Sequence, residues 1–353
     1  MKAWLQTAFG GAEVRGLTEV PEPRLAERDV LVRVHAFALN RLDLLQRVEV
    51  VVPGFAVPHV AGMDFAGVVD AAGGQEGEAL VGRTVLVDPV VSCGDCEYCA
   101  ADTPTYCAEF GTIGSTRWGG FGEFVAVPAR NCHVLDLDDG DVDGLIAAAS
   151  LPVAGVTAWR GLVSAGGVDA DTTVVIPGAG SGLGAAGIQI AKAKGARVLA
   201  LVGDPAKREA AIRLGADEVI DRSAGDWVES VLRLTDGRGA DLVWDHVGGR
   251  FLPQALLATR RGGRVVLSGT TDGLDTALHL PDLYQPGRQI IGHGSYGRQD
   301  MADVIEAYRT GVIAPVIDSV FDFDALPAAE AKLESGRFFG KIVVRGLPLG
   351  ASA

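Results

Sequence analysis

The chain has 353 residues, of which 48% are hydrophobic and 22% charged, so it is long enough for two domains with sizeable cores. Its formal net charge of −14 disfavours nucleic acids and anionic membranes as main partners, because binding phosphate groups needs a basic surface. No apolar stretch reaches membrane-spanning length and no signal peptide precedes the first strand-like segment, so we expect a cytoplasmic protein with a small-molecule partner.

Short apolar segments alternate with turns rich in Gly and Pro from residue 1 to about residue 145. This pattern predicts an irregular β-rich domain with short helices. The strand-like segments are Lys2–Leu5, Val30–Ala38, Ala66–Ala71, Val81–Val87 and Gly122–Val127.

Four of the five cysteines fall within fifteen residues, in a C-x2-C-x2-C-x7-C pattern. A disulfide framework is not expected in a chain without a secretory signal. Four thiolates on one loop can instead fill every position around a tetrahedral zinc ion, which makes such a site structural rather than catalytic. We therefore predict a structural zinc site made of Cys93, Cys96, Cys99 and Cys107.

Asn40, Asp43 and Arg47 would share one face of a helix over residues 40–47, because they lie three and seven positions apart. Such a line of polar groups can orient a substrate or hold a ribose. It can equally be a solvated face with an Asn cap and a local Asp–Arg pair, and the spacing alone favours this second interpretation.

A second metal site has less support in the sequence. His59 and Asp64 lie five residues apart and are too few to hold zinc by themselves. Cys132 and His133 could add ligands if the fold brought them near. Neighbouring core and surface side chains are the simpler interpretation.

Residues 174–187 combine an apolar run, a glycine-rich turn and the start of a helix, and a second apolar run follows at 198–202. This strand–turn–helix–strand unit lays a pyrophosphate across a helix N-terminus. A Cβ at the glycines would hold phosphate oxygens away from the backbone N–H groups. Gly182, Gly184 and Gly187 also satisfy the G-x-G-x-x-G pattern. The expected dinucleotide cradle is Gly178, Gly180, Ser181, Gly182, Leu183 and Gly184.

Four more strand candidates follow, separated by helical stretches. With the first two they make six strands that alternate with helices, which predicts a doubly wound parallel sheet. These four are Glu218–Ile220, Leu242–Asp245, Arg264–Ser268 and Gln289–Gly294.

The end of the second strand bears on the choice between NAD and NADP. Asp204 could accept hydrogen bonds from a ribose, but Pro205 follows it, and Asp before Pro is also a typical helix start. We expect Asp204 to be a helix cap first. The cations Lys207, Arg208 and Arg222 could surround a 2′-phosphate, so the sequence favours NADP(H) modestly over NAD(H).

After about residue 294 a helical stretch, a short strand, an amphipathic helix and a closing strand at Gly340–Arg345 follow a complete six-stranded unit. We expect this segment to return to the first domain. The expected divisions are therefore 1–145 for the first domain, 146–294 for the cofactor domain and 295–353 for the return.

Several separate motifs together resemble the medium-chain dehydrogenase/reductase superfamily, and the resemblance runs nearly end to end. It implies a GroES-like catalytic domain built from both chain ends, a central Rossmann cofactor domain, and dimers, or dimers of dimers, formed through the edge of its sheet. The matching pieces are Gly62–Gly67, Cys93–Cys107, Gly119–Phe124, Val156–Trp159, the glycine turn, Leu214–Asp217, Asp245–Gly249 and Gly340–Ile342.

The chain departs from the zinc-dependent alcohol dehydrogenases of this superfamily at the catalytic metal. Their Gly-His-Glu motif is replaced by Gly62-Met63-Asp64, and Asn40 stands where they place a cysteine. No Cys or Asp lies near Leu151–Gly155, where a third ligand is expected. The Asn-x-x-Asp pattern of Asn40 and Asp43 instead resembles the quinone oxidoreductase and enone reductase branch, which usually lacks the structural zinc loop.

This resemblance implies NADP(H)-dependent hydride transfer to an activated alkene or quinone, without a catalytic zinc. It places Asn40, Asp43 and Asp64 in the catalytic site, with Asp43 orienting Arg47 or the ribose. It adds Asn40, Thr157, Gly269 and Thr270 to the cofactor-binding residues. An alcohol dehydrogenase with an unusual metal site and a non-catalytic nucleotide-binding protein are the alternatives, and no proton donor is evident.

Overall fold

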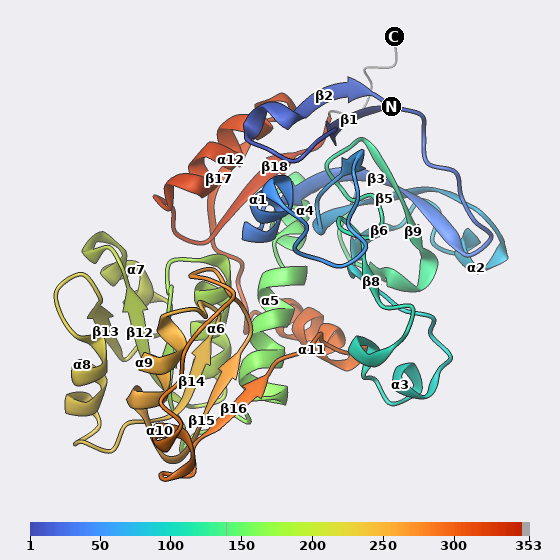
Figure 1. Ribbon diagram of the computed structural model, residues 1–353. Coiled ribbons are helices and arrows are strands. Elements are labelled where there is room, and N and C mark those ends of the chain that lie inside the picture. The colour runs from blue at the N-terminus through green and yellow to red at the C-terminus, as the bar shows by residue number, and fades with distance from the viewer. Residues whose placement is uncertain (139, 348–353) are drawn as a thin grey trace. The chain divides into compact units, whose positions relative to one another are not determined.

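The computed structural model describes residues 1–138 and 140–347, which divide into two compact units (Figure 1). Unit 1 comprises Met1–Val153 and the chain from Ile317 onward, and unit 2 comprises Ala154–Val316. The first division lies at 153 instead of the expected 145. The return begins at 317 instead of 295, because α11 (Arg298–Arg309) groups with unit 2.

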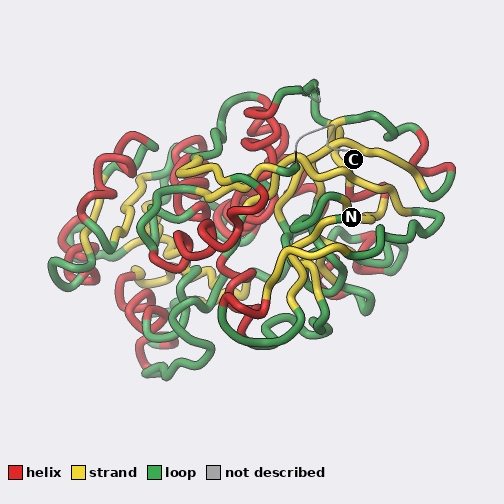
Figure 2. The backbone as a smooth tube through the Cα atoms, turned by 90° about the horizontal axis from the view of Figure 1, so that it is seen from above, coloured by secondary structure: helices red, strands yellow, loops and turns green. Residues whose placement is uncertain are grey.

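Unit 1 is built mainly from strands, and in Figure 2 the strands near the marked N-terminus are bordered largely by loops. Its described strands are β1 (Lys2–Gln6), β2 (Arg15–Glu19), β3 (Asp29–Ala38), β4 (His59–Val60), β5 (Asp64–Ala72), β6 (Thr84–Val87), β7 (Val90–Val91), β8 (Gly111–Thr112), β9 (Phe124–Pro128), β10 (Cys132–Val134), β17 (Ile317–Phe321) and β18 (Lys341–Arg345). Its helices are α1 (Arg41–Val48), α2 (Gln75–Glu78), α3 (Glu97–Ala100), α4 (Val142–Ala149) and α12 (Leu326–Ser335), with 3-10 turns η1 (Ala12–Val14), η2 (Pro104–Tyr106), η3 (Ala129–Asn131) and η6 (Phe323–Ala325).

The central strand of unit 1 is β3, which is buried along nearly its whole length. The main sheet runs β10-β6-β5-β3-β18-β17, with β9 also paired to β3, and a smaller sheet runs β2-β1-β4. Phe37, Phe65 and Phe121 are fully buried in the core of this unit. A β-rich first domain, as predicted, is therefore confirmed.

The chain returns to unit 1 through β17, α12 and β18. Strand β18 pairs antiparallel with β3, with Val343 opposite Ala38, and parallel with β17. Helix α12 lies beside these two strands (Figure 1) and ends at Gly336, whose φ of 66° is the left-handed conformation that suits a glycine cap.

Unit 2 contains the doubly wound parallel sheet that the sequence predicts. Its strand order is β13-β12-β11-β14-β15-β16, and all five neighbouring pairs are parallel. The strands are β11 (Thr173–Ile176), β12 (Arg197–Val202), β13 (Glu218–Asp221), β14 (Ala240–Asp245), β15 (Thr259–Leu267) and β16 (Gln289–Gly292). The helices are α5 (Pro152–Trp159), continued by the π-helical η4 (Arg160–Ser164), α6 (Gly182–Ala193), η5 (Pro205–Lys207), α7 (Arg208–Arg213), α8 (Trp227–Leu234), α9 (Phe251–Ala258), α10 (Pro281–Tyr284) and α11.

The strands of unit 2 read as continuous apolar runs because both of their faces are buried, as in β11 and β12. Trp227 and Phe251 stack with ring centroids 4.7 Å apart, which joins α8 to α9. Over the described part of the chain no single helix is long and apolar enough to cross a membrane, and only α4 with the α5–η4 segment passes, as a bent pair, by length and composition.

Candidate functional site

The glycine turn of unit 2 joins β11 to α6. Gly178 adopts a φ of 54°, the left-handed conformation in which a side chain is strained. Ser181 caps the helix, because its hydroxyl accepts a hydrogen bond from the Gly184 N–H at 3.0 Å. The turn from Gly178 to Ser181 therefore presents a capped helix N-terminus, where an anion is favoured.

The later glycines serve packing inside α6. A Cβ on Gly184 would lie 2.4 Å from the Gly178 carbonyl oxygen, and one on Gly187 would lie 2.6 Å from the Trp244 ring. Gly182 is the first residue of the helix. The G-x-G-x-x-G match at Gly182, Gly184 and Gly187 thus falls within the helix, and the turn that we expect to face a phosphate lies just before it. Leu183 occupies the first helical turn and is partly exposed.

His246 contacts the backbone at the start of this turn. It was not among the site residues predicted from the sequence. Its Nε2 lies 2.8 Å from the Pro177 carbonyl oxygen, and its ring would lie 3.0 Å from a Cβ on Gly178. Complete burial lowers the pKa of His246 to about 4, so the ring is neutral at pH 7 and donates its single Nε2 proton to Pro177. The only sequence signal is a histidine directly after the apolar strand β14.

The end of β12 carries the groups expected around the adenosine ribose. Asp204 caps η5, as expected, since its carboxylate accepts from the Ala206 N–H at 2.9 Å. The Lys207 side chain lies over the turn, with Cδ 2.6 Å from where a Cβ on Gly180 would be. The Arg222 guanidinium lies 3.5 Å from the Cβ position of Gly203. Arg208 is directed elsewhere, because it donates to the Val219 carbonyl.

The strand ends farther along the sheet hold three more of the residues expected to bind the cofactor. Gly269 and Thr270 pack against Gly248, whose added Cβ would lie 2.7 Å from the Gly269 carbonyl oxygen. The Thr157 carbonyl oxygen lies 3.1 Å from Nε2 of His293. These contacts place the three predicted residues at the carboxyl ends of β14 and β15 and beside the residue after β16, the edge at which parallel sheets bind ligands.

A buried polar cluster in unit 1 occupies the positions where zinc ligands of the resembled dehydrogenases are expected. The Asp64 carboxylate accepts from the Val153 N–H at 2.7 Å, from Asn40 Nδ2 at 2.9 Å and from Lys341 Nζ at 2.8 Å. Asp64 is fully buried. The Asp64 carboxylate thus contacts residues at the two other expected ligand positions, Asn40 and the 151–155 segment.

Lys341 is the residue of this cluster that the sequence reasoning missed. Its ammonium group donates to the Leu39 carbonyl at 2.9 Å, to Asn40 Oδ1 at 2.8 Å and to Asp64. All three ammonium hydrogens are therefore used within the protein. A lysine at the first position of a buried strand is the signal that could have identified it, because β18 is otherwise apolar up to its last residue.

Asp43 does not orient Arg47, contrary to expectation. Its Oδ2 accepts from the Asn40 N–H at 2.7 Å, closing the first turn of α1, while Arg47 donates to Glu330 at 2.8 Å and also contacts Glu334. The physical reason is that α12 presents two carboxylates to the same face of α1. Burial raises the pKa of Asp43 to about 7.

A second metal site would need ligands that the structure does not bring together. Over the described residues, one set of three or more His, Cys, Asp or Glu side chains is close enough to hold an ion, and it consists of the four loop cysteines. Met63 is buried, and burial lowers the pKa of His59 to about 4 and raises that of Cys132 to about 12.

The four loop cysteines fit a zinc ion. Their sulfur atoms all lie within 4.8 Å of one another, with Cys93 3.8 Å from Cys99 and 3.5 Å from Cys107. A tetrahedral shell of Zn–S bonds of about 2.3 Å requires sulfur–sulfur distances of roughly 3.8 Å. Backbone N–H groups of Gly94 and Cys96 point at the sulfurs at 3.4 Å, which favours thiolates. The predicted structural zinc site is thus present in the geometry.

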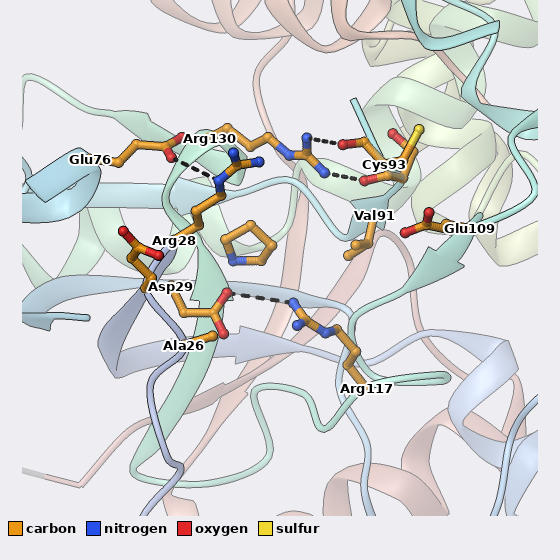
Figure 3. Close-up of a pocket in the computed structure, with 12 residues that line it drawn as sticks. Ala26, Arg28, Asp29, Glu76, Val91, Cys93, Glu109, Arg117 and Arg130 are labelled. Atoms are coloured by element: carbon orange, nitrogen blue, oxygen red, sulfur yellow. Dashed lines mark hydrogen bonds and ion pairs between the residues drawn. The ribbon is translucent and has the colours of Figure 1, made fainter. Parts of the chain in front are cut away.

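A pocket of about 420 Å³ lies beside this loop (Figure 3). Arg130 reaches from its wall to the loop and donates to the backbone carbonyls of Cys93, at 2.9 Å, and Ser92. The two other arginines on the wall face carboxylates, Arg28 facing Glu76 and Arg117 facing Asp29, each at 3.8 Å. The lining as a whole carries three arginines and four carboxylates, and Arg130 anchors the loop from the pocket wall.

Comparison with known proteins places both units in one kind of enzyme. Residues 26–137 match the family described as "Alcohol dehydrogenase GroES-like domain", and residues 182–310 match "Zinc-binding dehydrogenase". The NAD-dependent alcohol dehydrogenase of Sulfolobus acidocaldarius is 32% identical over 98% of this chain and 99% of its own. The acryloyl-coenzyme A reductase of Sulfurisphaera tokodaii is 27% identical over 93% of this chain and 96% of its own.

Solved structures give the same result. A crystal structure described as an NAD-dependent alcohol dehydrogenase superimposes with a TM-score of 0.89 at 35% identity, covering 98% of this chain and 99% of the other. The GroES-like and Rossmann units inferred from the sequence are therefore confirmed.

Proposed function

Because the chain belongs to the zinc-binding dehydrogenases of the medium-chain dehydrogenase/reductase superfamily and is an NAD(P)-dependent oxidoreductase, we propose that it reduces activated alkenes or quinones with NADPH, without a catalytic zinc. One observation carries the proposal. At the positions where catalytic ligands are expected, Asn40, Met63 and the 151–155 segment supply no thiolate or imidazole, and the remaining carboxylate, Asp64, is hydrogen-bonded on both oxygens. An amide and a thioether in place of Cys and His are poor zinc ligands.

The chemistry of such a reduction needs a hydrogen-bond donor rather than a metal. When NADPH is bound, it supplies a hydride to the β-carbon of the alkene, and the electron pair of the double bond moves toward the conjugated oxygen. Asn40 would donate a hydrogen bond to that oxygen as its negative charge develops. The proton that completes the reduction at the α-carbon would come from solvent.

The proposed preference for NADPH rests on two cations near the end of β12. Arg222 lies beside Gly203 and Lys207 lies over Gly180 of the turn, at the part of the cradle where we expect the adenosine ribose. A 2′-phosphate would add charge-assisted contacts there. An acidic residue at this position would normally disfavour a 2′-phosphate. The Asp204 carboxylate disfavours it less, because it accepts a hydrogen bond in capping η5.

Alcohol oxidation is the second candidate, and it is favoured by relatives such as the Sulfolobus acidocaldarius NAD-dependent alcohol dehydrogenase. It would require either a further metal site or a general base. Asp43 is the buried carboxyl group nearest to Asn40 along α1, and its pKa of about 7 would suit proton transfer.

A homodimer is also part of the proposal. Strand β16 is one of the two edge strands of the six-stranded sheet, and both Gln289 and Gly292 on it are exposed. Two copies could join their sheets through this edge. Multi-angle light scattering should give twice the chain mass of 36.6 kDa.

The decisive experiment measures kcat/KM with NADPH and with NADH on a panel of enones, quinones and primary and secondary alcohols, on protein of known zinc content. We expect turnover with enones or quinones at about one zinc per chain, the amount that the cysteine loop accounts for. Alcohol oxidation that appears only with a second equivalent of zinc would replace this proposal with the second candidate.

The variant Asn40→Ala tests whether Asn40 donates a hydrogen bond to the substrate oxygen. It should lower kcat by roughly 100-fold, the usual cost of losing one donor to a developing oxyanion, while the Kd for NADPH stays nearly unchanged. Glu49→Ala, at an exposed position just after α1, is the control and should leave both constants unchanged. Unchanged turnover in Asn40→Ala would remove Asn40 from the site.

A further inference from the structure

We propose that Lys341 is a positioning residue that orients and polarises the Asn40 amide, so that a buried ammonium ion strengthens the donor facing the substrate. The inference rests on the proposed function in assigning the substrate contact to Asn40. It concerns a residue from a strand 301 positions away, whose three contacts all lie in unit 1.

The orientation of the amide follows from the chemistry of its two partners. An ammonium group can only donate and an ionised carboxylate can only accept. Oδ1 must therefore face Lys341, at 2.8 Å, and Nδ2 must face Asp64, at 2.9 Å. A flipped amide would put two donors together and an oxygen against a carboxylate.

This orientation leaves one hydrogen for a ligand. Nδ2 carries two hydrogens, and within the described residues Asp64 accepts one of them. Asn40 itself is half-buried, unlike Asp64 and Lys341, whose side chains are 0% and 7% exposed. The cluster thus leaves one N–H of a half-buried amide without an acceptor among the described residues, next to two buried charged groups.

The strength of that N–H depends on the charge behind it. A cation hydrogen-bonded to an amide oxygen draws electron density from the nitrogen and makes its remaining N–H a better donor. The effect is larger in a buried site, where water screens the ammonium charge weakly. Asp64 balances the charge, which allows Lys341 to be buried, and its second oxygen is held by the Val153 N–H.

Lys341 does not contact the substrate in this arrangement, because its three hydrogens are already donated to Leu39, Asn40 and Asp64. Its effect must therefore appear in the rate of the chemical step rather than in nucleotide binding. This separates it from a residue that only stabilises the fold.

The test compares Lys341→Met with the charge-neutral pair Lys341→Met/Asp64→Asn. Lys341→Met leaves the Asp64 carboxylate buried without its cation and can fail to fold, whereas the paired variant keeps an acceptor oxygen for Asn40 and removes both charges. We expect the paired variant to fold with a lower Tm, because the Leu39 carbonyl loses its donor and one amide oxygen cannot replace both carboxylate oxygens of Asp64. It should keep its Kd for NADPH, while kcat falls by about tenfold or more and KM changes little. Wild-type kcat in the paired variant would overturn the proposal, because Lys341 would then serve only to neutralise Asp64.

Lys332→Met/Asp318→Asn is the matched control. It removes another lysine–aspartate ion pair of unit 1, and neither residue belongs to the cluster. Its kcat should equal that of the wild type. A loss as large as in the Lys341 pair would contradict a specific role for Lys341.

A second readout does not depend on turnover. The side-chain 15N–1H2 resonances of Asn40, assigned by their loss in Asn40→Ala, should lie downfield in the wild type and move upfield in the paired variant. If the wild type reduces no substrate of the panel but the shift is seen, the proposed function fails and the polarised amide stands. If the wild type is active but the resonances do not move, the polarisation fails and the proposed function stands.

Discussion

Arg130 donates a hydrogen bond to the backbone carbonyl of Cys93 over 2.9 Å, joining η3 to the start of the cysteine loop. The same guanidinium also holds the Ser92 carbonyl. Two hydrogen bonds from one planar cation therefore hold the two peptide groups on either side of Cys93.

Arg130→Gln should therefore increase the rate at which the cysteine loop releases zinc. Loss of a charged hydrogen bond at a partly exposed site costs about 1 kcal/mol, which corresponds to roughly fivefold faster transfer of zinc to a chromogenic chelator. Arg28→Gln changes a neighbouring arginine on the same pocket wall that does not hold the loop and should transfer zinc at the wild-type rate. Equal rates of zinc transfer for the wild type and both variants would show that the hydrogen bonds of Arg130 do not affect zinc release.

Cys107→Ser should remove the zinc and lower the Tm. The Cys107 sulfur lies 3.5 Å from that of Cys93 and is the most buried of the four, so a hydroxyl in its place cannot complete a tetrahedral thiolate shell. Plasma mass spectrometry should find about one zinc per chain in the wild type and almost none in the variant. Cys132→Ala, which changes the cysteine outside the loop, should retain its zinc.

Gly178→Ala should weaken nucleotide binding. Alanine at a φ of 54° is strained by about 1–2 kcal/mol, and its Cβ would sit 3.0 Å from the His246 ring. The turn must shift, and we expect the Kd for NADPH, measured by calorimetry, to rise roughly tenfold. Gly225→Ala, at a glycine with open space around its Cβ position and no left-handed φ, provides the baseline. Equal affinities would mean that the turn tolerates a side chain at Gly178.

Arg222→Ala should reduce the preference for NADPH. Its guanidinium is placed beside Gly203 at the end of β12, where a 2′-phosphate would gain a charged partner. We expect kcat/KM with NADPH to fall about tenfold, equivalent to about 1.4 kcal/mol, while the value with NADH stays within about twofold. Arg213→Ala, which removes an exposed ion pair with Glu209, should change neither. An equal fall with both cofactors would place Arg222 elsewhere in the site.

His246 should make the free energy of unfolding decrease as the pH falls below 6.5. Its folded pKa of about 4 lies below the ordinary 6.5, so the unfolded chain binds the proton more readily. The contribution is fully present above pH 6.5 and is lost as the pH falls toward 4; a shift of this size is worth about 3 kcal/mol. His246→Gln keeps a donor for Pro177 but does not titrate. The stability difference between wild type and variant, from urea unfolding, should therefore change between pH 7 and pH 4, and parallel profiles would contradict this account.

Local spacing explains what the sequence predicts well. The turn at Gly178–Ser181 and the four cysteines are each defined by residues close together in the chain, so their geometry follows from turn and metal chemistry. The six parallel strands follow from alternating apolar runs. The unit to which α11 belongs could not be predicted, because its apolar face does not identify the surface that it packs against.

The contacts of Asn40 and Arg47 show which features could not be predicted from the sequence. Asn40 could be compared with a family motif, but its partner Lys341 is 301 residues away on a strand whose pairing with β3 is a tertiary fact. Similarly, Arg47 on α1 contacts Glu330 because α12 packs near α1 in the folded protein. Neither contact has a periodic or spacing signal, because each joins segments that are far apart in the sequence and meet only through tertiary packing.

The pairing of β18 with β3 has a consequence for biosynthesis. Strand β3 leaves the ribosome before any part of unit 2 is made, whereas β18 is made after all of it. Until β18 is made, Asn40 and Asp64 lack their cation and Ala36–Ala38 of β3 lack the strand that pairs with them, so unit 1 cannot complete its sheet before unit 2 has been synthesised.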